Sequence, residues 1–238
     1  MLFRSVFTLP FILPDHKAWD AATTEPTIVN DYFELVRKAG AEPLAMGETG
    51  YRQVSNSKRA VKAPDDLKGI KIRVVGSPMY GEIMSGMGAN PTFMSWADTQ
   101  PALASGAIDA QENPLEVFLA AKINTLGQKF VTKWNYSNDI LLFAIAGPVW
   151  ASWTAADQKT VREAAQDAAK QQVALVRKLF AEDVDRVRAL GVNVHVPSAA
   201  ETQAWQIATR RTYARWKVAT HPGLVAKIEQ AAAQSRKA

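Results

Sequence analysis

The chain of 238 residues contains no cysteine. This absence excludes disulfide scaffolds, thiolate zinc sites and cysteine nucleophiles, and it leaves the redox compartment open. Long apolar runs are also missing, because the longest, Ile140 to Trp150, is far shorter than the roughly 20 residues that a membrane helix needs. Neither sign of charge dominates: 28 Lys and Arg stand against 23 Asp and Glu, which leaves a net charge of +5. A mild, scattered positive charge could favour anionic ligands, but it is not typical of a nucleic-acid-binding protein.

The usual catalytic and metal-binding motifs are lacking too. The three histidines, His16, His195 and His221, are isolated, and no H-E-x-x-H motif occurs. No G-x-S-x-G elbow supports a hydrolase. The segment from Gly76 to Gly81 follows an expected strand, but it lacks the spacing of a dinucleotide-binding loop and the Lys-Ser/Thr pair of a phosphate-binding loop. We therefore interpret it as a turn, and we expect no metal and no cofactor.

The composition that remains is typical of a folded domain, with 47% apolar and 21% charged residues. Segments with strand character alternate with segments of helical periodicity, which predicts an α/β fold. The clearest strand is Ile70–Val74, where apolar and charged residues alternate. The other expected strands are 43–46, 51–54, 107–110, 129–133, 140–146 and 192–196, with an extended stretch at 89–94. The expected helices are about 19–37, 78–87, 96–106, 114–126, 154–190, 199–219 and 224–235, with a loop at 47–50 and a single turn at 64–67.

The longest helical pattern covers residues 154–190. At about 1.5 Å per residue, such a helix would be on the order of 55 Å long, more than the width of one domain. We therefore expect it to bridge two lobes. One continuous apolar stripe runs along it, through Val173, Val176, Phe180, Val184 and Val187.

Two charged stretches are interpreted as solvent-facing. On the long helix, Glu182, Asp183 and Asp185 lie among basic residues, a mixture that indicates a solvated face. In the 199–219 helix, arginines 210, 211 and 215 interleave with aromatic residues. That pattern could stack on nucleic acid, but aromatic rings that pack inward with arginines in solvent are the simpler interpretation. We therefore expect no nucleic-acid partner.

Four residues form a candidate binding site. Arg52, Arg73, Trp96 and Asn113 each fall at the end of an expected strand or in the loop after one, where ligands bind in open α/β sheets. An arginine can bind a carboxylate through two parallel hydrogen bonds, and an asparagine amide both donates and accepts. The set suits a small carboxylate. An arginine so placed is more often part of a surface ion pair, so the spacing alone leaves both interpretations open.

Four longer stretches of the sequence are informative as words: Leu9-Pro10-Phe11, DLKGIKIRV at 66–74, GANPT at 88–92 and GAIDAQENP at 106–114. These stretches resemble a known family, the DctP-type solute-binding proteins of TRAP transporters. The resemblance runs over essentially the whole chain from Val6 onward, and its most specific parts are the blocks around Arg73 and Asn113.

This resemblance implies a two-lobed, periplasmic-binding-protein-like α/β fold with a hinge crossed by long elements, and closure of the lobes around an organic acid. It also implies that the binding is oriented by one main arginine, supported by a second arginine, an aromatic ring and an amide. The residues in these roles are Arg73, Arg52, Trp96 and Asn113 in that order, with Tyr136 and Asn135 as further candidates.

The resemblance also suggests a division of the chain. We expect 1–70 to be the remainder of a first lobe, 71–136 to be a second lobe, and 137–238 to hold crossover strands, the long bridging helix and C-terminal helices, with the lobes interleaved. Members of the family carry a signal peptide and two or three further β-α units before the Leu-Pro-Phe segment. Here Met1 to Ser5 matches nothing in the family, and the chain opens in apolar sequence without a secretory pattern. We therefore expect an incomplete first lobe, with the N-terminal part of the protein missing from this chain.

The chain departs from the family at three places near the expected site. It has Ser95-Trp96-Ala97-Asp98 where many members read Ser-Glu-Val-Tyr, Asn135-Tyr136 where Asn-His is frequent, and Asp109-Ala110 where Asp-Gly is usual. These departures concern the distal contacts of the substrate and not the binding of its carboxylate. The sequence therefore does not name the acid, since sugar acids, C4-dicarboxylates and keto acids all fit.

The implied function is capture of a small organic acid in the periplasm, without chemistry, and delivery to the membrane permease subunits of a TRAP transporter. We expect the protein to act as a monomer. Two alternatives stay open. A ligand-sensing subunit of a signalling receptor would have the same binding site. An enzyme acting on organic acids would have to use Asp109 and Glu112 as a carboxylate pair, with no partner base or metal motif beside them.

Overall fold

The computed structural model describes residues 5–236, so the expectations for 1–4 and for 237–238 lie outside the described residues. The chain forms two compact units. Unit 1 combines Met1–Gly50, Ser137–Lys178 and Lys217–Ala238, and unit 2 combines Tyr51–Tyr136 and Leu179–Trp216. The predicted lobe boundaries at 70 and 136 stay predictions; in the structure, residues 51–70 belong to unit 2.

Unit 2 is built on a six-stranded sheet with the order β4-β3-β5-β2-β6-β8. Strand β3 pairs in parallel with both β4 and β5, whereas β2 pairs antiparallel with β5 and β6, and β6 pairs in parallel with β8. The strands are β2 (Gln53–Asn56), β3 (Lys71–Val74), β4 (Asn90–Phe93), β5 (Ala110–Asn113), β6 (Phe130–Thr132) and β8 (Asn193–His195).

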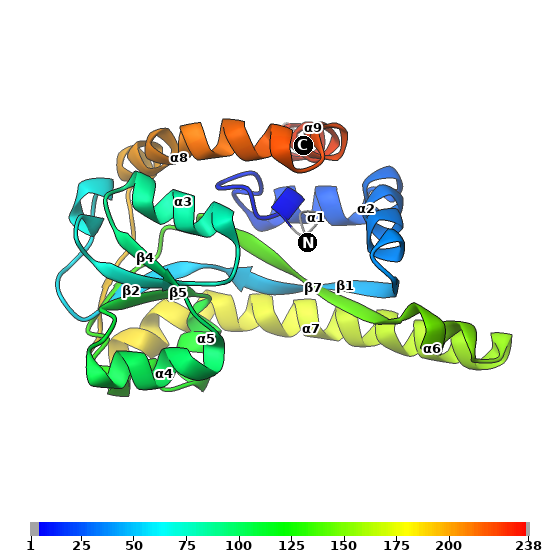
Figure 1. The fold of residues 1–238 in the computed structure, drawn as a ribbon, viewed down its shortest axis with the longest axis horizontal. Coiled ribbons are helices and arrows are strands. Elements are labelled where there is room, and N and C mark those ends of the chain that lie inside the picture. Colours follow the sequence, from blue (N-terminus) through cyan, green and yellow to red (C-terminus); the bar gives the residue numbers. More distant parts are fainter. Residues whose placement is uncertain (1–4, 237–238) are drawn as a thin grey trace. The chain divides into compact units, whose positions relative to one another are not determined.

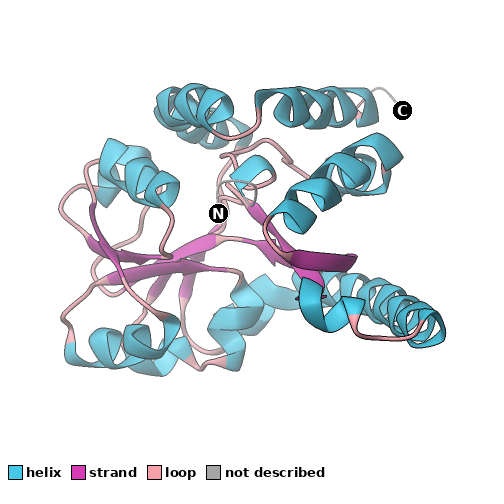
Figure 2. Cartoon of the chain, turned by 45° about the vertical axis from the view of Figure 1, so that its right-hand side comes forward, coloured by secondary structure: helices cyan, strands magenta, loops and turns pink. Residues whose placement is uncertain are grey.

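Helices cover both faces of this sheet (Figures 1 and 2). Helix α3 (Pro78–Gly86) lies on one face, and α4 (Trp96–Ser105) and α5 (Leu115–Ala120) lie on the other. Two short 3-10 helices complete the unit, η2 (Pro64–Leu67) and η3 (Ile123–Leu126). The apolar core on the side of α4 and α5 consists of Leu103, Ile108, Leu115, Phe118, Ile123, Val131, Val187, Val192 and Val194.

Local sequence signals set several of these ends, as predicted. The Ser95 hydroxyl accepts a hydrogen bond from the backbone N of Asp98 and begins α4, and Gly106 ends the helix in the left-handed conformation with φ 72°. The single turn at 64–67 is confirmed as η2. The expected strand at 107–110 is wrong, because the strand is Ala110–Asn113, held between β2 and β3. The expected helix at 114–126 is interrupted at Lys122, which has a φ of 50°.

Unit 1 contains a two-stranded sheet of β1 (Ala41–Tyr51, whose last residue lies in unit 2) and β7 (Asn138–Ala146). The expected loop at 47–50 is wrong, since those residues continue β1. Glycine is favoured at position 47 of this strand, because a Cβ there would lie only 2.5 Å from Oε1 of Gln172 and would clash with it. The helices of this unit are α1 (His16–Thr24), α2 (Pro26–Lys38), α6 (Gly147–Ala151) and α9 (Pro222–Ser235).

The single helix expected over 19–37 is two helices in the structure, α1 and α2. The break falls at Glu25, which is extended, and Pro26, which begins α2. Proline disfavours helical geometry in the residue before it and lacks an N–H for the preceding turn, so it begins a helix and does not continue one.

Helices α7 (Ala155–Ala189) and α8 (Ala199–Ala219) each contribute residues to both units. The long helix is therefore confirmed, with 35 residues. The expectation that Asp183 lies on a solvated face is wrong, because its side chain is buried and its Oδ1 is 2.6 Å from Nζ of Lys133. In α8, Trp205 and Trp216 are buried whereas the three arginines are exposed, as expected. Within residues 5–236, no helix is long and apolar enough to cross a membrane.

Candidate functional site

All six predicted site residues lie in unit 2. Arg52 stands between β1 and β2, Arg73 is in β3, Trp96 is the first residue of α4, and Asn113 is the last residue of β5. The register pairs Arg73 with Gln111 across β3 and β5. Side chains at paired positions, and at every second position of one strand, share a face of the sheet. Arg73, Gln111 and Asn113 therefore lie on one face.

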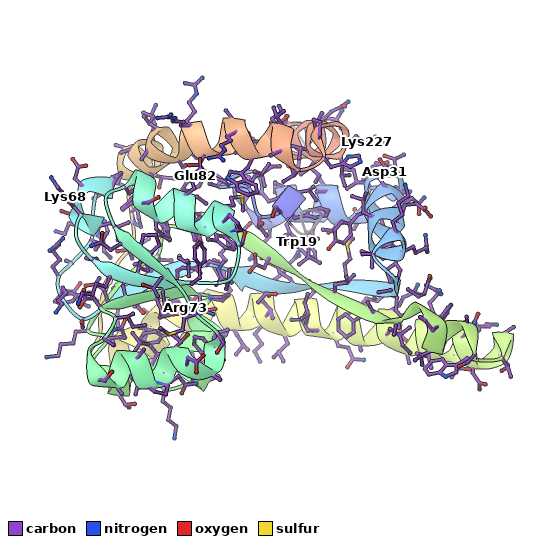
Figure 3. All side chains as sticks on the ribbon, in the orientation of Figure 1. Trp19, Asp31, Lys68, Arg73, Glu82 and Lys227 are labelled. Atoms are coloured by element: carbon purple, nitrogen blue, oxygen red, sulfur yellow. The ribbon has the colours of Figure 1, made fainter. Side chains whose placement is uncertain are left out.

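Arg73 is a buried cation with few partners. Its side chain is 4% exposed, its Nε donates to the backbone O of Met94 at 3.0 Å, and its Cζ lies 5.6 Å from the centroid of the Trp96 ring. Figure 3 shows it beside the sheet, on the side of α4. Among residues 5–236, no acidic side chain forms an ion pair with it. Burial lowers the pKa of Arg73, with opposing effects from Glu112, which raises it, and Arg52, which lowers it.

Arg52, in contrast, has an internal carboxylate. Its Nε and Nη2 donate to the two carboxylate oxygens of Glu112, and Nη2 also donates to the backbone O of Glu112 at 2.8 Å. The hydroxyl of Tyr136 donates to Oε2 of the same glutamate at 2.7 Å. The Arg52 and Glu112 side chains are 4% and 0% exposed. Glu112 therefore neutralises Arg52 in a site that excludes water.

A chain of hydrogen bonds holds the amide of Asn113. Its Nδ2 donates to Oε1 of Gln111 at 2.6 Å, and its Oδ1 accepts from Nη2 of Arg52 at 3.3 Å. Gln111 in turn donates to the hydroxyl of Ser55 at 2.8 Å, and Ser55 donates to Oε1 of Gln128 at 2.9 Å. These buried groups fix which end of the Asn113 amide faces Arg52, because each of them has a partner that determines its own orientation.

The remaining candidates contact their neighbours within unit 2. Trp96 is half-buried and packs at the edge of the apolar core. Asn135, with a φ of 52°, exchanges two hydrogen bonds with the Gln53 amide, at 2.6 and 3.0 Å. Tyr136 is completely buried, and its burial, together with the charge of Glu112, raises its pKa well above the ordinary value. The sequence places Tyr136 and Asn135 near the site, and the structure gives each a defined internal partner.

The residue that sequence analysis undervalued is Glu112, which was considered only as half of a carboxylate pair with Asp109. The two carboxylates have different partners, since Asp109 accepts from the backbone N of Lys71 at 3.0 Å and lies 3.1 Å from Nζ of Lys58. Strand β5 reads Ala-Gln-Glu-Asn, so it is polar after its first residue and has no apolar periodicity to show that Glu112 is buried. Within the described part of the chain, no cluster of three or more His, Asp or Glu could hold a metal ion.

Comparisons with known proteins identify the family. Residues 4–218 match the DctP family, described as bacterial extracellular solute-binding protein, family 7. A TRAP periplasmic solute-binding protein from Ralstonia eutropha H16, solved with bound (S)-2-acetolactate, is 50% identical and has a TM-score of 0.94, over 97% of this chain and 74% of that one. Another, from Bordetella bronchiseptica with ligand density assigned to pantoate, is 30% identical with a TM-score of 0.87, over 94% of this chain and 73% of that one.

A curated relative adds to these structures. The 2,3-diketo-L-gulonate-binding periplasmic protein YiaO of Escherichia coli K12 is 34% identical over 194 residues, which are 80% of this chain and 57% of the relative. This chain spans about half of the length of the curated relatives that it matches. The α/β fold expected from the sequence agrees with that of the solved relatives. The chain belongs to the DctP family of bacterial extracellular solute-binding proteins.

Proposed function

We propose that this protein captures a small organic acid by its carboxylate in the periplasm and delivers it to the permease subunits of a TRAP-type secondary transporter. Family membership supports this role, because the solved relatives are named TRAP periplasmic solute-binding proteins and one of them holds a hydroxy acid. The proposal involves no chemical change of the ligand.

The observation that carries the proposal is the state of Arg73. A guanidinium at 4% exposure loses most of its hydration, and burial of a charge is costly unless an opposite charge compensates it. Arg52 has that compensation from Glu112, whereas the partners of Arg73 among residues 5–236 are the carbonyl of Met94 and the face of the Trp96 ring. A ligand carboxylate would supply the missing charge to Arg73 through two parallel hydrogen bonds.

For the ligand, we propose a short, branched 2-hydroxy acid. The Ralstonia protein, at 50% identity, binds (S)-2-acetolactate, and pantoate, assigned in the Bordetella protein, is also a branched acid with a hydroxyl next to the carboxylate. A 2-hydroxyl group suits an asparagine amide, which both donates and accepts, and Asn113 is held by Gln111 on the same face of the sheet as Arg73. A sugar acid is the alternative, in line with the Escherichia coli relative.

Thermal-shift measurements test both parts. The probes are (S)-2-acetolactate, pantoate and 2,3-diketo-L-gulonate, with the amide of pantoic acid as a neutral control. At 100 times its dissociation constant a ligand adds about 2.7 kcal/mol to the free energy of unfolding, which for a protein of this size raises the Tm by roughly 5–11 °C.

We expect the short hydroxy acids to give this shift and the neutral amide to give none. The Arg73→Met variant should lose the response, whereas Arg210→Met, which removes an exposed arginine of α8, should keep it. An equal shift with the neutral amide, or full binding by Arg73→Met, would refute the proposal. A response to 2,3-diketo-L-gulonate alone would keep the transport role and replace the ligand class.

A further inference from the structure

The chain passes between the two units four times, after Gly50, Tyr136, Lys178 and Trp216. Three residues of unit 1 lie within two residues of the unit 1 ends of the first three passages: Glu48, Asn138 and Arg177. They come from β1, β7 and α7, which are far apart in the sequence. In the structure, the side chains of these three residues meet.

Glu48 is the centre of this meeting point. Its carboxylate is completely buried and accepts a hydrogen bond from Nδ2 of Asn138 at 2.7 Å and from Nε of Arg177 at 2.9 Å. His16 of α1 lies on the same carboxylate, with Nε2 3.3 Å from Oε1. One carboxylate therefore joins the ends of three connecting segments to each other and to α1.

The backbone of Glu48 is held as well. Gln172 of α7 accepts from the backbone N of Glu48 at 3.0 Å and donates to its backbone O at 2.7 Å. The absence of a side chain at Gly47 permits this approach, because a Cβ there would lie 2.5 Å from Oε1 of Gln172. Strand β1 is thus fixed to α7 by main chain and side chain together, two residues before it leaves unit 1.

Arg177 has a second anchor. Its Nη1 and Nη2 donate to the two carboxylate oxygens of Asp20 at 3.0 and 2.6 Å, and its Cζ lies 5.3 Å from the ring centroid of Trp19, which Figure 3 labels on α1. The hydrogen bonds that Arg177 donates to Asp20 raise the pKa of Arg177. Burial alone would raise the pKa of Glu48, but the nearby imidazole of His16 and the hydrogen bonds from Asn138 and Arg177 outweigh burial and hold it below the ordinary value. The carboxylate is therefore ionised at neutral pH.

A buried ionised group is weak evidence for stability, because apolar residues of similar volume often stabilise a core equally well. What such a group does provide is a defined geometry, since its partners must keep their positions to satisfy it. We infer that Glu48 is a positioning residue that fixes the directions in which three of the four connecting segments leave unit 1, and that ligand affinity depends on it although it lies outside the binding site. The dependence of ligand affinity on Glu48 rests on the proposed function. The positioning of the connecting segments by Glu48 does not rest on it.

The chain offers a matched control. Glu42 is also in β1, and its carboxylate also accepts from an arginine of α7, since Nη2 of Arg162 lies 2.8 Å from Oε1. It also pairs with Arg37 of α2, and its pKa is also below the ordinary value, with hydrogen bonds outweighing burial. Glu42 lies eight residues before the nearest passage, which follows Gly50, whereas Glu48 lies two residues before it. The variants Glu48→Gln and Glu42→Gln therefore remove the same charge from the same strand, and only one of them affects the connecting segments.

The test compares these variants in two measurements. Affinity for (S)-2-acetolactate and for pantoate is measured by calorimetry. Independently of any ligand, spin labels on Lys38→Cys in unit 1 and Ser105→Cys in unit 2, both at exposed positions, report the distribution of distances between the units by pulsed EPR. The chain has no native cysteine to interfere with the labels. Urea unfolding monitors the stability of each variant.

We expect Glu48→Gln to broaden the distance distribution and to weaken binding by a factor of about 5 or more, the lower end of usual coupling between sites. The reason is that a smaller fraction of the free protein would then be in the binding-competent arrangement. Glu42→Gln should lower stability without either effect. Equal distance distributions and equal affinities for the two variants would overturn the inference, whatever their stabilities.

Two further outcomes are also decisive. If Glu48→Gln does not fold, Arg177→Lys replaces it, because an ammonium group cannot span Glu48 and Asp20 as the guanidinium does; an unchanged distribution in that variant overturns the inference. If the unmodified protein binds neither acid, the proposed ligand class fails. The distance distributions then decide the inference by themselves.

Discussion

Removal of either partner of the Arg52–Glu112 pair should destabilise unit 2 strongly. Both side chains are almost fully buried, so Arg52→Met removes the cation beside the Glu112 carboxylate and leaves it the hydroxyl of Tyr136 as a hydrogen-bond donor in unit 2. Breaking a buried pair in this way costs about 3–5 kcal/mol, because an uncompensated charge stays in the interior. For a chain of this size, that loss lowers the Tm by roughly 6–20 °C.

The intact Arg52–Glu112 pair should contribute much less to the free energy of unfolding than the loss in a single variant suggests. We expect Glu112→Gln to cost a similar amount to Arg52→Met, since it removes the negative charge of Glu112 from beside the buried Arg52 cation. The double variant Arg52→Met/Glu112→Gln should be less destabilised than the sum of the single variants, by about 1–3 kcal/mol, because it leaves neither charge unpaired.

Urea unfolding at neutral pH, followed by circular dichroism, measures all four free energies of the cycle. The same assay distinguishes the effect of Arg52 on stability from that of Arg73. Arg73→Met removes a buried cation that has no carboxylate partner among residues 5–236, so this variant should leave stability unchanged or raise it. The reasoning is refuted if each single variant of the pair costs less than about 1 kcal/mol, or if the two effects are additive.

Three further predictions concern the binding site and the meeting point in unit 1. Arg73→Lys should weaken the binding of pantoate more than Arg52→Lys does, because an ammonium group cannot form the two parallel bonds of a guanidinium; equal affinity of Arg73→Lys and the unmodified protein in calorimetry would remove Arg73 from the site. Trp96→Phe should abolish most of the change in tryptophan fluorescence on addition of the acid, and a full change in this variant would place the responding tryptophan elsewhere. Because the pKa of Glu48 is lowered on folding, its ionisation stabilises the protein above the ordinary value of 4.5 and this contribution is lost as the pH falls below it. Urea unfolding between about pH 6 and pH 3 should therefore show a smaller acid-dependent loss in Glu48→Gln, and parallel curves would contradict this.

Several features of the fold follow from residues close together in the sequence. Ser95 and Gly106 delimit α4 because a hydroxyl caps free N–H groups and glycine adopts the left-handed conformation without strain. The extent of α7 follows from an uninterrupted helical periodicity between Thr154 and Gly191. The division of α1 from α2 at Pro26 was visible in the same way, and the prediction of one helix gave the apolar periodicity too much weight against the proline.

The proximity of two of the predicted site residues was also predictable in outline. Arg73 and Trp96 are brought together as expected for residues at neighbouring strand ends, with the Arg73 guanidinium 5.6 Å from the Trp96 ring centroid. Their assignment as ligand contacts stays a prediction. The strand pattern did not predict that the two arginines of this set differ: within the described residues, Arg52 pairs with the carboxylate of Glu112 and Arg73 pairs with no carboxylate.

The sequence by itself determined the fold class, the helix ends that depend on local capping, and the residue types that can bind a carboxylate. Only the tertiary structure decided which charges are already compensated. It paired Arg52 with Glu112, buried Asp183 against Lys133, and gathered Asn138 and Arg177 on Glu48. The physical reason is that caps and periodicity depend on residues within a few positions of each other. The cost of burying a charge depends instead on partners that lie 50 to 129 positions away in these cases.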